Sequence, residues 1–192
     1  IFIAARTAQL WEARLELGRF KEAAELLGPI ALSAMPPSDT KDRAILGLIR
    51  AFYGMKEYNA VIESRKSARD SIRSSSTRMQ TALFAAQAYT RIGKPADAIS
   101  LLNLILADTG LTPAERETVI FAQISALIAE KRYAEARALL DAKADYTDQA
   151  RAAFLKAETS YYLKSYADAK KEYDAFILTY ADSPLKSQAL YG

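Results

Sequence analysis

The amino-acid sequence predicts an all-α protein in which about five helix-turn-helix units stack into an α-α superhelix, or solenoid. Two interleaved repeats carry this prediction. The first is a Ser or Thr that opens a helix in steps of 36, 36, 35 and 36 residues, near Thr40, Ser76, Thr112, Thr147 and Ser183. The second is an aromatic residue or Pro with a small or β-branched residue three positions later, beginning at Phe20, Tyr58, Pro95, Tyr133 and Tyr166. Apolar residues between these points follow the helical period and show no strand-like alternation.

The spacing divides the 192 residues into one array. Its units are expected at residues 1–38, 39–74, 75–110, 111–146 and 147–182, with the start of a further helix at 183–192. A single helical hairpin cannot cover its own apolar face, so each unit must stack on a neighbour. The chain begins at Ile1-Phe2-Ile3-Ala4-Ala5 without Met, and its last helix stops at Gly192. We therefore expect a fragment of a longer array.

Helix starts and turns have recognisable local chemistry. Thr112, Pro113 and Glu115 form a capping box with Pro at the first helical position. The run 74–77, which reads Ser-Ser-Ser-Thr, is interpreted as a junction between units in which one residue caps the next helix. Gly93 is expected to end a helix in the left-handed conformation, and Pro95 to begin the next one.

Composition narrows the possible chemistry. Apolar residues make up 51% of the chain, while Cys and His are absent. Disulfides, zinc sites built from Cys or His, and catalysis by imidazole or thiolate are therefore excluded. The seven glycines are dispersed and form no phosphate-binding loop. We expect no enzyme activity, no cofactor, no metal site and, without an apolar run of 18 residues, no membrane span in this segment.

The formal net charge is only +3, and acidic and basic residues alternate over most of the chain. The densest basic patch holds Arg65, Arg69 and Arg73, joined by Lys66 and Arg78. It could dock an anionic partner, or it could be a solvated outer face balanced by neighbouring acids. The second interpretation is favoured, because aromatic residues that would stack on nucleic-acid bases are missing between the arginines.

The turn sequences resemble those of the tetratricopeptide repeat (TPR) family, over essentially the whole chain. Gly18-Arg19-Phe20 is followed by Ala23 and Leu27, and Gly93-Lys94-Pro95 by Ala98 and Leu102. The fourth and fifth units keep the aromatic and small residues but carry Lys131 and Lys164 at the Gly position. The second unit departs most, with Val61 and Arg65 at the Ala and Leu positions.

The last unit is similar to a bacterial envelope subgroup of that family. Its aromatic-rich run from Tyr161 to Tyr180 ends in Asp182-Ser183-Pro184. The subgroup includes the lipoprotein of the outer-membrane β-barrel assembly machine and the periplasmic partner of the Tol-Pal system. This resemblance implies a bacterial envelope location, in the periplasm.

In the resembled family, the first helix of each unit lines a concave face that binds peptides or proteins. The resemblance implies that the corresponding residues of this chain line its concave face. They are Arg43, Leu46, Arg50 and Tyr53; Gln80, Leu83, Gln87 and Thr90; Thr118, Phe121, Ser125 and Ile128; and Arg151, Phe154, Glu158 and Tyr161. Phe121, Phe154 and Tyr161 could instead pack between neighbouring units. The Lys and Asn residues with which some members grip a terminal carboxylate are not present at these places.

The resemblance implies a non-catalytic scaffold or adaptor that binds a protein or peptide on its concave face, within a bacterial envelope assembly. Two alternatives stay open. The chain could be the helical accessory region of a larger enzyme, or it could bind nucleic acid or anionic lipid through the basic patch. Nucleic acid is the less expected partner. The oligomeric state is not predicted.

Overall fold

The computed structural model describes residues 10–34, 36–143 and 145–190, and within these ranges the regular structure is entirely helical. The chain forms two compact units, each of which holds more than one helical repeat: the first unit is Ile1–Val119 and the second unit is Ile120–Gly192. The boundary between them falls inside helix α7 (Pro113–Ala129). The expectations for Ile1–Ala5 and for the end at Gly192 lie outside the described residues.

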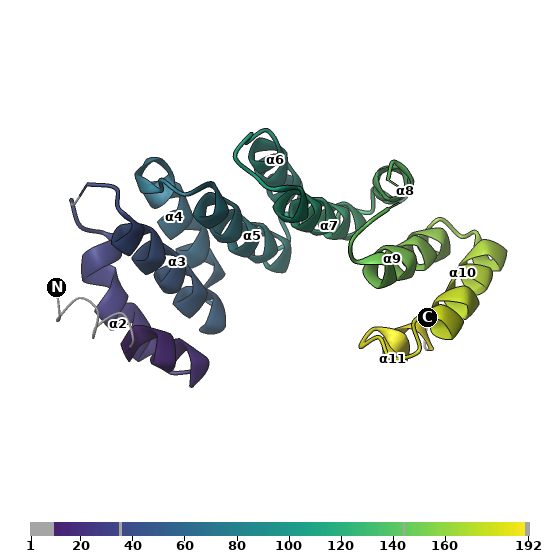
Figure 1. Ribbon diagram of the computed structural model, residues 1–192, viewed down its shortest axis with the longest axis horizontal. Coiled ribbons are helices and arrows are strands. Elements are labelled where there is room, and N and C mark those ends of the chain that lie inside the picture. The colour runs from purple at the N-terminus through teal and green to yellow at the C-terminus, as the bar shows by residue number, and fades with distance from the viewer. Residues whose placement is uncertain (1–9, 35, 144, 191–192) are drawn as a thin grey trace. The chain divides into compact units, whose positions relative to one another are not determined.

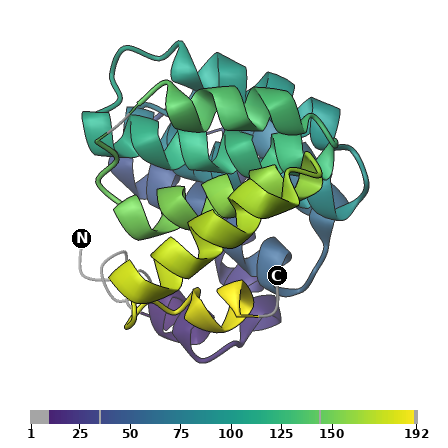
Figure 2. The ribbon, with the colours of Figure 1, turned by 90° about the vertical axis from the view of Figure 1, so that its right-hand side faces the viewer.

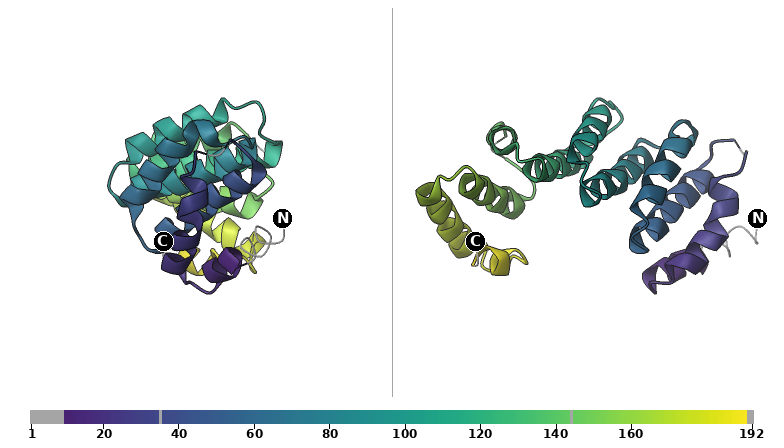
Figure 3. Two further views of the ribbon diagram at one scale, coloured as in Figure 1. Left: turned by 90° about the vertical axis from the view of Figure 1, so that its left-hand side faces the viewer. Right: turned by 180° about the vertical axis from the view of Figure 1, so that it is seen from behind.

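The first unit contains three successive first helices and their partners. Residues 10–16 are helical, and they are followed by α2 (Phe20–Ala31), α3 (Asp39–Gly54), α4 (Tyr58–Ala68), the 3-10 turn η1 (Arg69–Ser71), α5 (Ser75–Arg91), α6 (Pro95–Leu106) and the start of α7. Helix α3 packs against α2, α4 and α5 (Figures 1 and 3). Helix α4 in turn contacts both the first helix of its own hairpin, α3, and that of the next, α5.

The second unit continues the same pattern. It holds the end of α7 and then α8 (Tyr133–Asp141), α9 (Gln149–Tyr162), α10 (Tyr166–Thr179) and the short α11 (Lys186–Ala189). Helix α9 packs against α8 and α10, and α10 contacts α11 (Figure 2). The core between α9 and α10 is aromatic, since Phe154 contacts the rings of Tyr173 and Phe176.

The helices begin close to the predicted points, and two of them are capped by a neighbour of the predicted residue. The capping box at Thr112 is confirmed: its Oγ1 accepts a hydrogen bond from the Glu115 N–H at 3.2 Å, and Glu115 accepts one from the Thr112 N–H at 2.9 Å. Elsewhere an earlier or later neighbour caps the helix. Ser38 and Asp148 accept the first-turn N–H groups, in place of Thr40 and Thr147. The prediction that one residue of the run 74–77 caps the next helix is confirmed, since Ser74 accepts the Thr77 N–H.

A short helix, α11, lies within the predicted segment 183–192, but it begins at Lys186 and not at Ser183-Pro184. Ser183 Oγ instead accepts a hydrogen bond from the Leu185 N–H, two residues on, at 3.3 Å. This closes a turn, and α11 begins only at Lys186.

Each hairpin turns through one residue with a left-handed backbone. The φ angles are 71° at Gly18, 62° at Lys56, 75° at Gly93, 62° at Lys131 and 64° at Lys164. The hydrogen bonds are those of a Schellman motif: at the third turn, the Lys94 N–H donates to the Tyr89 carbonyl and the Gly93 N–H donates to that of Thr90. The same two bonds recur at the other four turns. Lysine thus holds a strained conformation that favours glycine at three of them.

The small residues after each turn are fully enclosed. Ala23, Val61, Ala98 and Ala136 are 0% exposed, and Ala169 is 2% exposed. The apolar residues four positions later, Leu27, Leu102 and Leu140, are also 0% exposed. Small side chains at this point let adjacent helices approach closely, which explains why the position is so uniform along the chain.

Polar ties join each repeat to the next one. Asp42, at the start of α3, is 2% exposed and accepts hydrogen bonds from the N–H groups of Arg73 and Ser74 at 3.2 and 2.8 Å. In the second unit, Arg137 of α8 donates to Ser160 of α9 at 2.6 Å and to Glu172 of α10 at 2.9 Å. One guanidinium therefore connects three helices.

The left-handed lysines predict a gain of stability on replacement by glycine. Lys131→Gly should raise the free energy of unfolding by about 0.5–1 kcal/mol, because relief of backbone strain outweighs the extra entropy of the unfolded chain. Gly93→Ala should lower it by about 1 kcal/mol. Urea unfolding measures both variants, and a destabilised Lys131→Gly variant would contradict the turn geometry.

The three-helix tie predicts a large loss of stability on truncation. Arg137→Ala should cost about 2 kcal/mol, because it leaves Glu172 and Ser160 partly buried without their charged donor. Arg132→Ala is the matched control: its ion pair with Glu135 is exposed and should contribute less than about 0.5 kcal/mol. Equal unfolding midpoints for the two variants would show that the contacts of Arg137 with Ser160 and Glu172 do not stabilise the fold.

Candidate functional site

The first unit places most of the predicted partner-binding residues in contact with solvent. On α3, Arg43 and Arg50 are exposed, while Leu46 and Tyr53 are half-buried. On α5, the exposed residues are Gln80 and Gln87, and the half-buried ones are Leu83 and Thr90; Thr118, on α7, is exposed. Helices α3 and α5 are in contact, so the predicted residues on α3 and those on α5 lie on neighbouring first helices.

Several of these side chains are already engaged within the protein. Arg43 forms an ion pair with Glu12, and its guanidinium lies 5.7 Å from the centre of the Trp11 ring. Gln80 donates to Ser76 Oγ at 3.2 Å. The hydroxyls of Thr90 and Thr118 donate to backbone carbonyls one turn earlier in their helices, at 3.1 and 3.0 Å.

Arg50 and Gln87 differ from the others. They occupy equivalent places on α3 and α5, both are exposed, and neither makes a hydrogen bond or ion pair to any described residue. A guanidinium and an amide held open on adjacent helices can bind acceptors supplied from outside.

The second unit changes the predicted set. Phe121 and Phe154 are only 2% and 7% exposed. Both rings therefore pack inside the protein, which was the alternative interpretation, and they are not available to contact a partner. Ser125 is exposed, but its hydroxyl donates to the Phe121 carbonyl at 3.0 Å. Ile128 is half-buried.

The burial of Phe121 has a cause that the repeat pattern does not reveal. Its ring lies 5.1 Å from that of Tyr146, and the Arg151 guanidinium lies 4.8 Å above it. Arg43 makes the same kind of contact with Trp11. Both arginines hold the same place in their repeats and stack on an aromatic residue of the preceding first helix. Arg151 therefore has a packing role that the sequence analysis missed.

Two tyrosines at the end of α9 are exposed. Tyr161 is 45% exposed and Tyr162 is 40% exposed. Tyr162 stacks on Tyr133 of α8, with ring centres 4.8 Å apart. Glu158, one turn before Tyr161, is half-buried, and burial raises the pKa of its carboxyl. Burial, followed by the nearby Glu158 charge, also raises the pKa of Tyr173 to about 12.

Two residues of the basic patch are paired with carboxylates. Lys66 pairs with Glu63 at 2.9 Å, and Arg78 pairs with Asp108 at 2.9 Å and also donates to backbone carbonyls of residues 72 and 73. Arg65 is half-buried, and burial, followed by the neighbouring Arg69, lowers its pKa. Arg69 and Arg73 are exposed, and Arg69 reaches the Asp70 carboxylate at 4.0 Å.

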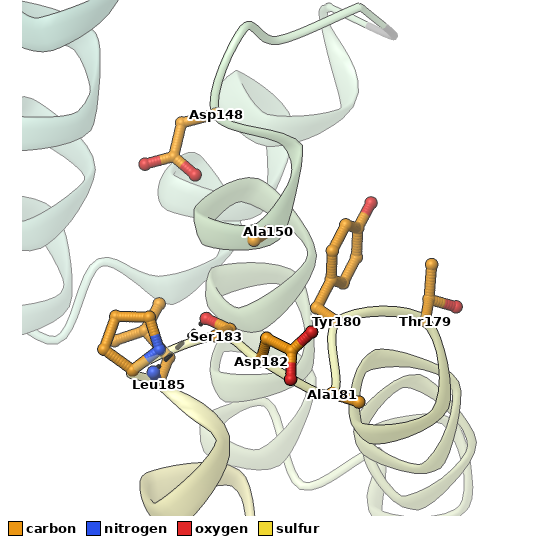
Figure 4. Close-up of a pocket in the computed structure, with 9 residues that line it drawn as sticks. Asp148, Ala150, Thr179, Tyr180, Ala181, Asp182, Ser183 and Leu185 are labelled. Carbon is orange, nitrogen blue, oxygen red and sulfur yellow. Dashed lines mark hydrogen bonds between the residues drawn. The ribbon is translucent and has the colours of Figure 1, made fainter.

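Two surface depressions lie in the second unit. The larger, of about 440 Å³, lies between the start of α9 and the loop that joins α10 to α11. Figure 4 shows that the Asp148 and Asp182 carboxylates on its rim lie apart and do not converge on one point. The smaller depression, of about 340 Å³, is bordered by Tyr161, Tyr166 and Tyr173.

Residues 10–34, 36–143 and 145–190 contain no cluster of three acidic side chains placed to hold a metal ion. Over the same ranges, no helix has both the length and the hydropathy needed to cross a lipid bilayer.

Solved structures similar to this chain are helical-repeat proteins. A kinesin light chain-like protein of Podosopora anserina with nearly identical TPR-like repeats superposes with a TM-score of 0.75 at 17% identity, covering 94% of this chain and 96% of the other. A variant of that protein with one substituted residue gives 0.74 at 18% identity, covering 93% and 96%. No protein-family model matches the sequence, and no curated protein matches it. The chain therefore has the fold of a TPR-like helical solenoid.

The raised pKa of Tyr173 predicts a loss of stability in alkali. An unfolded tyrosine releases its proton near pH 10, but folded Tyr173 keeps it until about pH 12, so stability must fall as the pH rises between these values. Tyr173→Phe should make this fall shallower. Urea unfolding measured at intervals from about pH 9 to 11.5 tests this, and an unchanged slope in the variant would contradict the assignment.

Proposed function

We propose that this chain is a non-catalytic scaffold that binds a partner protein or peptide through the exposed faces of its first helices. The observation that carries the proposal is that Arg50 and Gln87 are both exposed and make no hydrogen bond or ion pair to any described residue. Two polar groups with unused hydrogen-bonding capacity stand at the same place on adjacent helices. The TPR-like fold supports a protein partner in general.

The surroundings of this pair suit a protein or peptide interface. Leu46 and Leu83 are half-buried beside the two polar residues, and Tyr53 contributes an aromatic edge. Apolar and aromatic contacts bordered by arginine and amide groups are typical of protein interfaces. Nucleic acid is the less suitable partner, because two of the five basic residues of the patch, Lys66 and Arg78, pair with carboxylates and Arg65 is half-buried.

A more specific proposal, a role in a bacterial envelope assembly, rests only on the resemblance of the last repeat, from Tyr161 to Pro184. The solved structures similar to this chain give no support for that location, since they are less than 25% identical and indicate the fold alone.

Site-specific photo-crosslinking tests the binding face. A photoreactive amino acid placed at Arg50 or Gln87 should yield one discrete crosslinked partner in native extract. The same group at Ser100, which is exposed on α6, should not. Crosslinks of equal yield at all three positions would contradict a specific face on α3 and α5.

A charge reversal measures the strength of the interaction. Arg50→Glu should weaken binding of the crosslinked partner about tenfold or more, equal to about 1.4 kcal/mol, by removing the donor and adding repulsion. Because Arg50 is exposed and makes no hydrogen bond or ion pair to the described residues, the unfolding midpoint should not change. Glu63→Lys, at an exposed position of α4, is the charge-changing control. Unchanged affinity of the Arg50→Glu variant would show that this face of α3 does not contact the partner.

A further inference from the structure

One repeat departs from the others at a position that is otherwise enclosed and apolar or aromatic. The position lies four residues after the enclosed small residue that follows each turn. In α4 it holds Arg65, whereas the other repeats hold side chains that are at most 8% exposed: Leu27, Leu102, Leu140 and Tyr173. A guanidinium at a core position carries a desolvation cost that leucine avoids. Exceptions of this kind to a sequence pattern are expected at functional sites.

Arg65 lies inside the array of repeats. Helix α4 packs against α3 of its own hairpin and against α5 of the next one. Both neighbours of this helix are therefore present, and the burial of Arg65 does not depend on any repeat beyond the described residues.

No charged partner within residues 10–34, 36–143 and 145–190 compensates the Arg65 guanidinium. The side chain makes no ion pair there, and its Nε is fully enclosed without a hydrogen-bond acceptor. Burial, followed by the like charge of Arg69 one turn later, lowers the pKa of Arg65. Tyr89 of α5 acts in the opposite direction, but its phenol is uncharged at neutral pH. An anion beside Arg65 would therefore relieve an existing energetic cost.

Arg69 supplies a second guanidinium beside Arg65. The two residues are four positions apart, so they share one face of this helical segment. Arg69 is exposed, and the Asp70 carboxylate that it reaches at 4.0 Å is itself fully exposed. Because Asp70 offsets part of the charge of Arg69, the pair suits one singly charged carboxylate.

We propose that Arg65 and Arg69 together bind the carboxylate of one acidic side chain on a partner protein. Guanidinium groups match carboxylates in charge and in hydrogen-bond geometry. A polyanion fits this surface less well. The exposed carboxylates of Glu63 and Asp70 would repel the closely spaced phosphates of a nucleic acid or the headgroups of an anionic membrane.

Only the class of partner in this inference rests on the proposed scaffold function. The function proposed above depends on Arg50 and Gln87, on α3 and α5, whereas this site depends on Arg65 and Arg69, at the end of α4. Substitutions at one pair leave the other pair unaltered, so failure of one proposal is distinguishable from failure of the other.

The probe is a short peptide of glutamate residues, and the corresponding glutamine peptide is its control. Each peptide is titrated into the 192-residue protein while the NMR signals of the arginine Nε–H groups are followed. With the glutamate peptide alone, we expect the signals of Arg65 and Arg69 to shift together and to saturate. The signal of Arg19 should not move, although its guanidinium is also exposed and lies 3.9 Å from the Glu22 carboxylate.

Two variants test the pair of arginines. Arg65→Leu introduces the residue that other repeats hold at this position, so it should raise the urea midpoint of unfolding and weaken binding of the glutamate peptide at least about tenfold. Arg69→Ala should weaken binding at least about fivefold. The NMR signal of the remaining arginine reports the affinity in each case. Arg19→Ala is the matched control and should bind the peptide like the unaltered protein.

Three kinds of result would overturn the proposal. The first is the absence of a saturable shift at Arg65, or a similar shift at Arg19. The second is a lower unfolding midpoint or an unchanged affinity in Arg65→Leu, because Arg65 would then serve the packing alone. The third is tighter binding of phosphatidylserine vesicles or of a single-stranded oligonucleotide than of the peptide, with the same dependence on Arg65.

Discussion

The structure depends on a single backbone constraint, the left-handed residue at each hairpin. That residue lets two carbonyls at the end of the first helix accept hydrogen bonds from the turn, and it sends the chain directly into the second helix. The short turn makes the two helices antiparallel neighbours. Lys56, Lys131 and Lys164 meet this constraint at an energetic cost, so the packing that follows must favour the turn more strongly than the side chain opposes it.

Stacking follows from the turn. A hairpin fixed in this way presents a small, enclosed residue such as Ala98 or Ala136 to its neighbours, and the close approach buries the following leucine. Polar ties then align successive hairpins, as Asp42 does at the start of α5 and Arg137 does across α8, α9 and α10. Because these contacts use the sides of the first helices that face other helices, residues such as Arg50 and Gln87 stay exposed to solvent.

The sequence predicts the repeat and the helix order well, because both follow from residue types at a fixed spacing. It identifies the capping residues less well. Around Ser74, Ser75, Ser76 and Thr77 several hydroxyls compete, and only the final backbone geometry decides which one accepts the N–H. The repeat spacing places Lys131 and Lys164 at the Gly position, but the residue type alone does not indicate that these lysines adopt the left-handed conformation.

The candidate site was predicted in part. Helical phase identifies which side of a helix a residue occupies, but it does not show which neighbour reaches that side. Phe121 and Phe154 have the correct phase and are nevertheless covered, by Arg151 and Tyr146 in one case and by α10 in the other. The smaller surface depression, along α10, depends on Leu190 and Ile177, which no local motif brings together.

The most direct test of the central claim is the backbone conformation of the three turn lysines in a high-resolution crystal structure. We expect φ of about +60° at Lys56, Lys131 and Lys164, with both Schellman hydrogen bonds present. Negative φ angles at these residues, with the turns closed in another way, would contradict it.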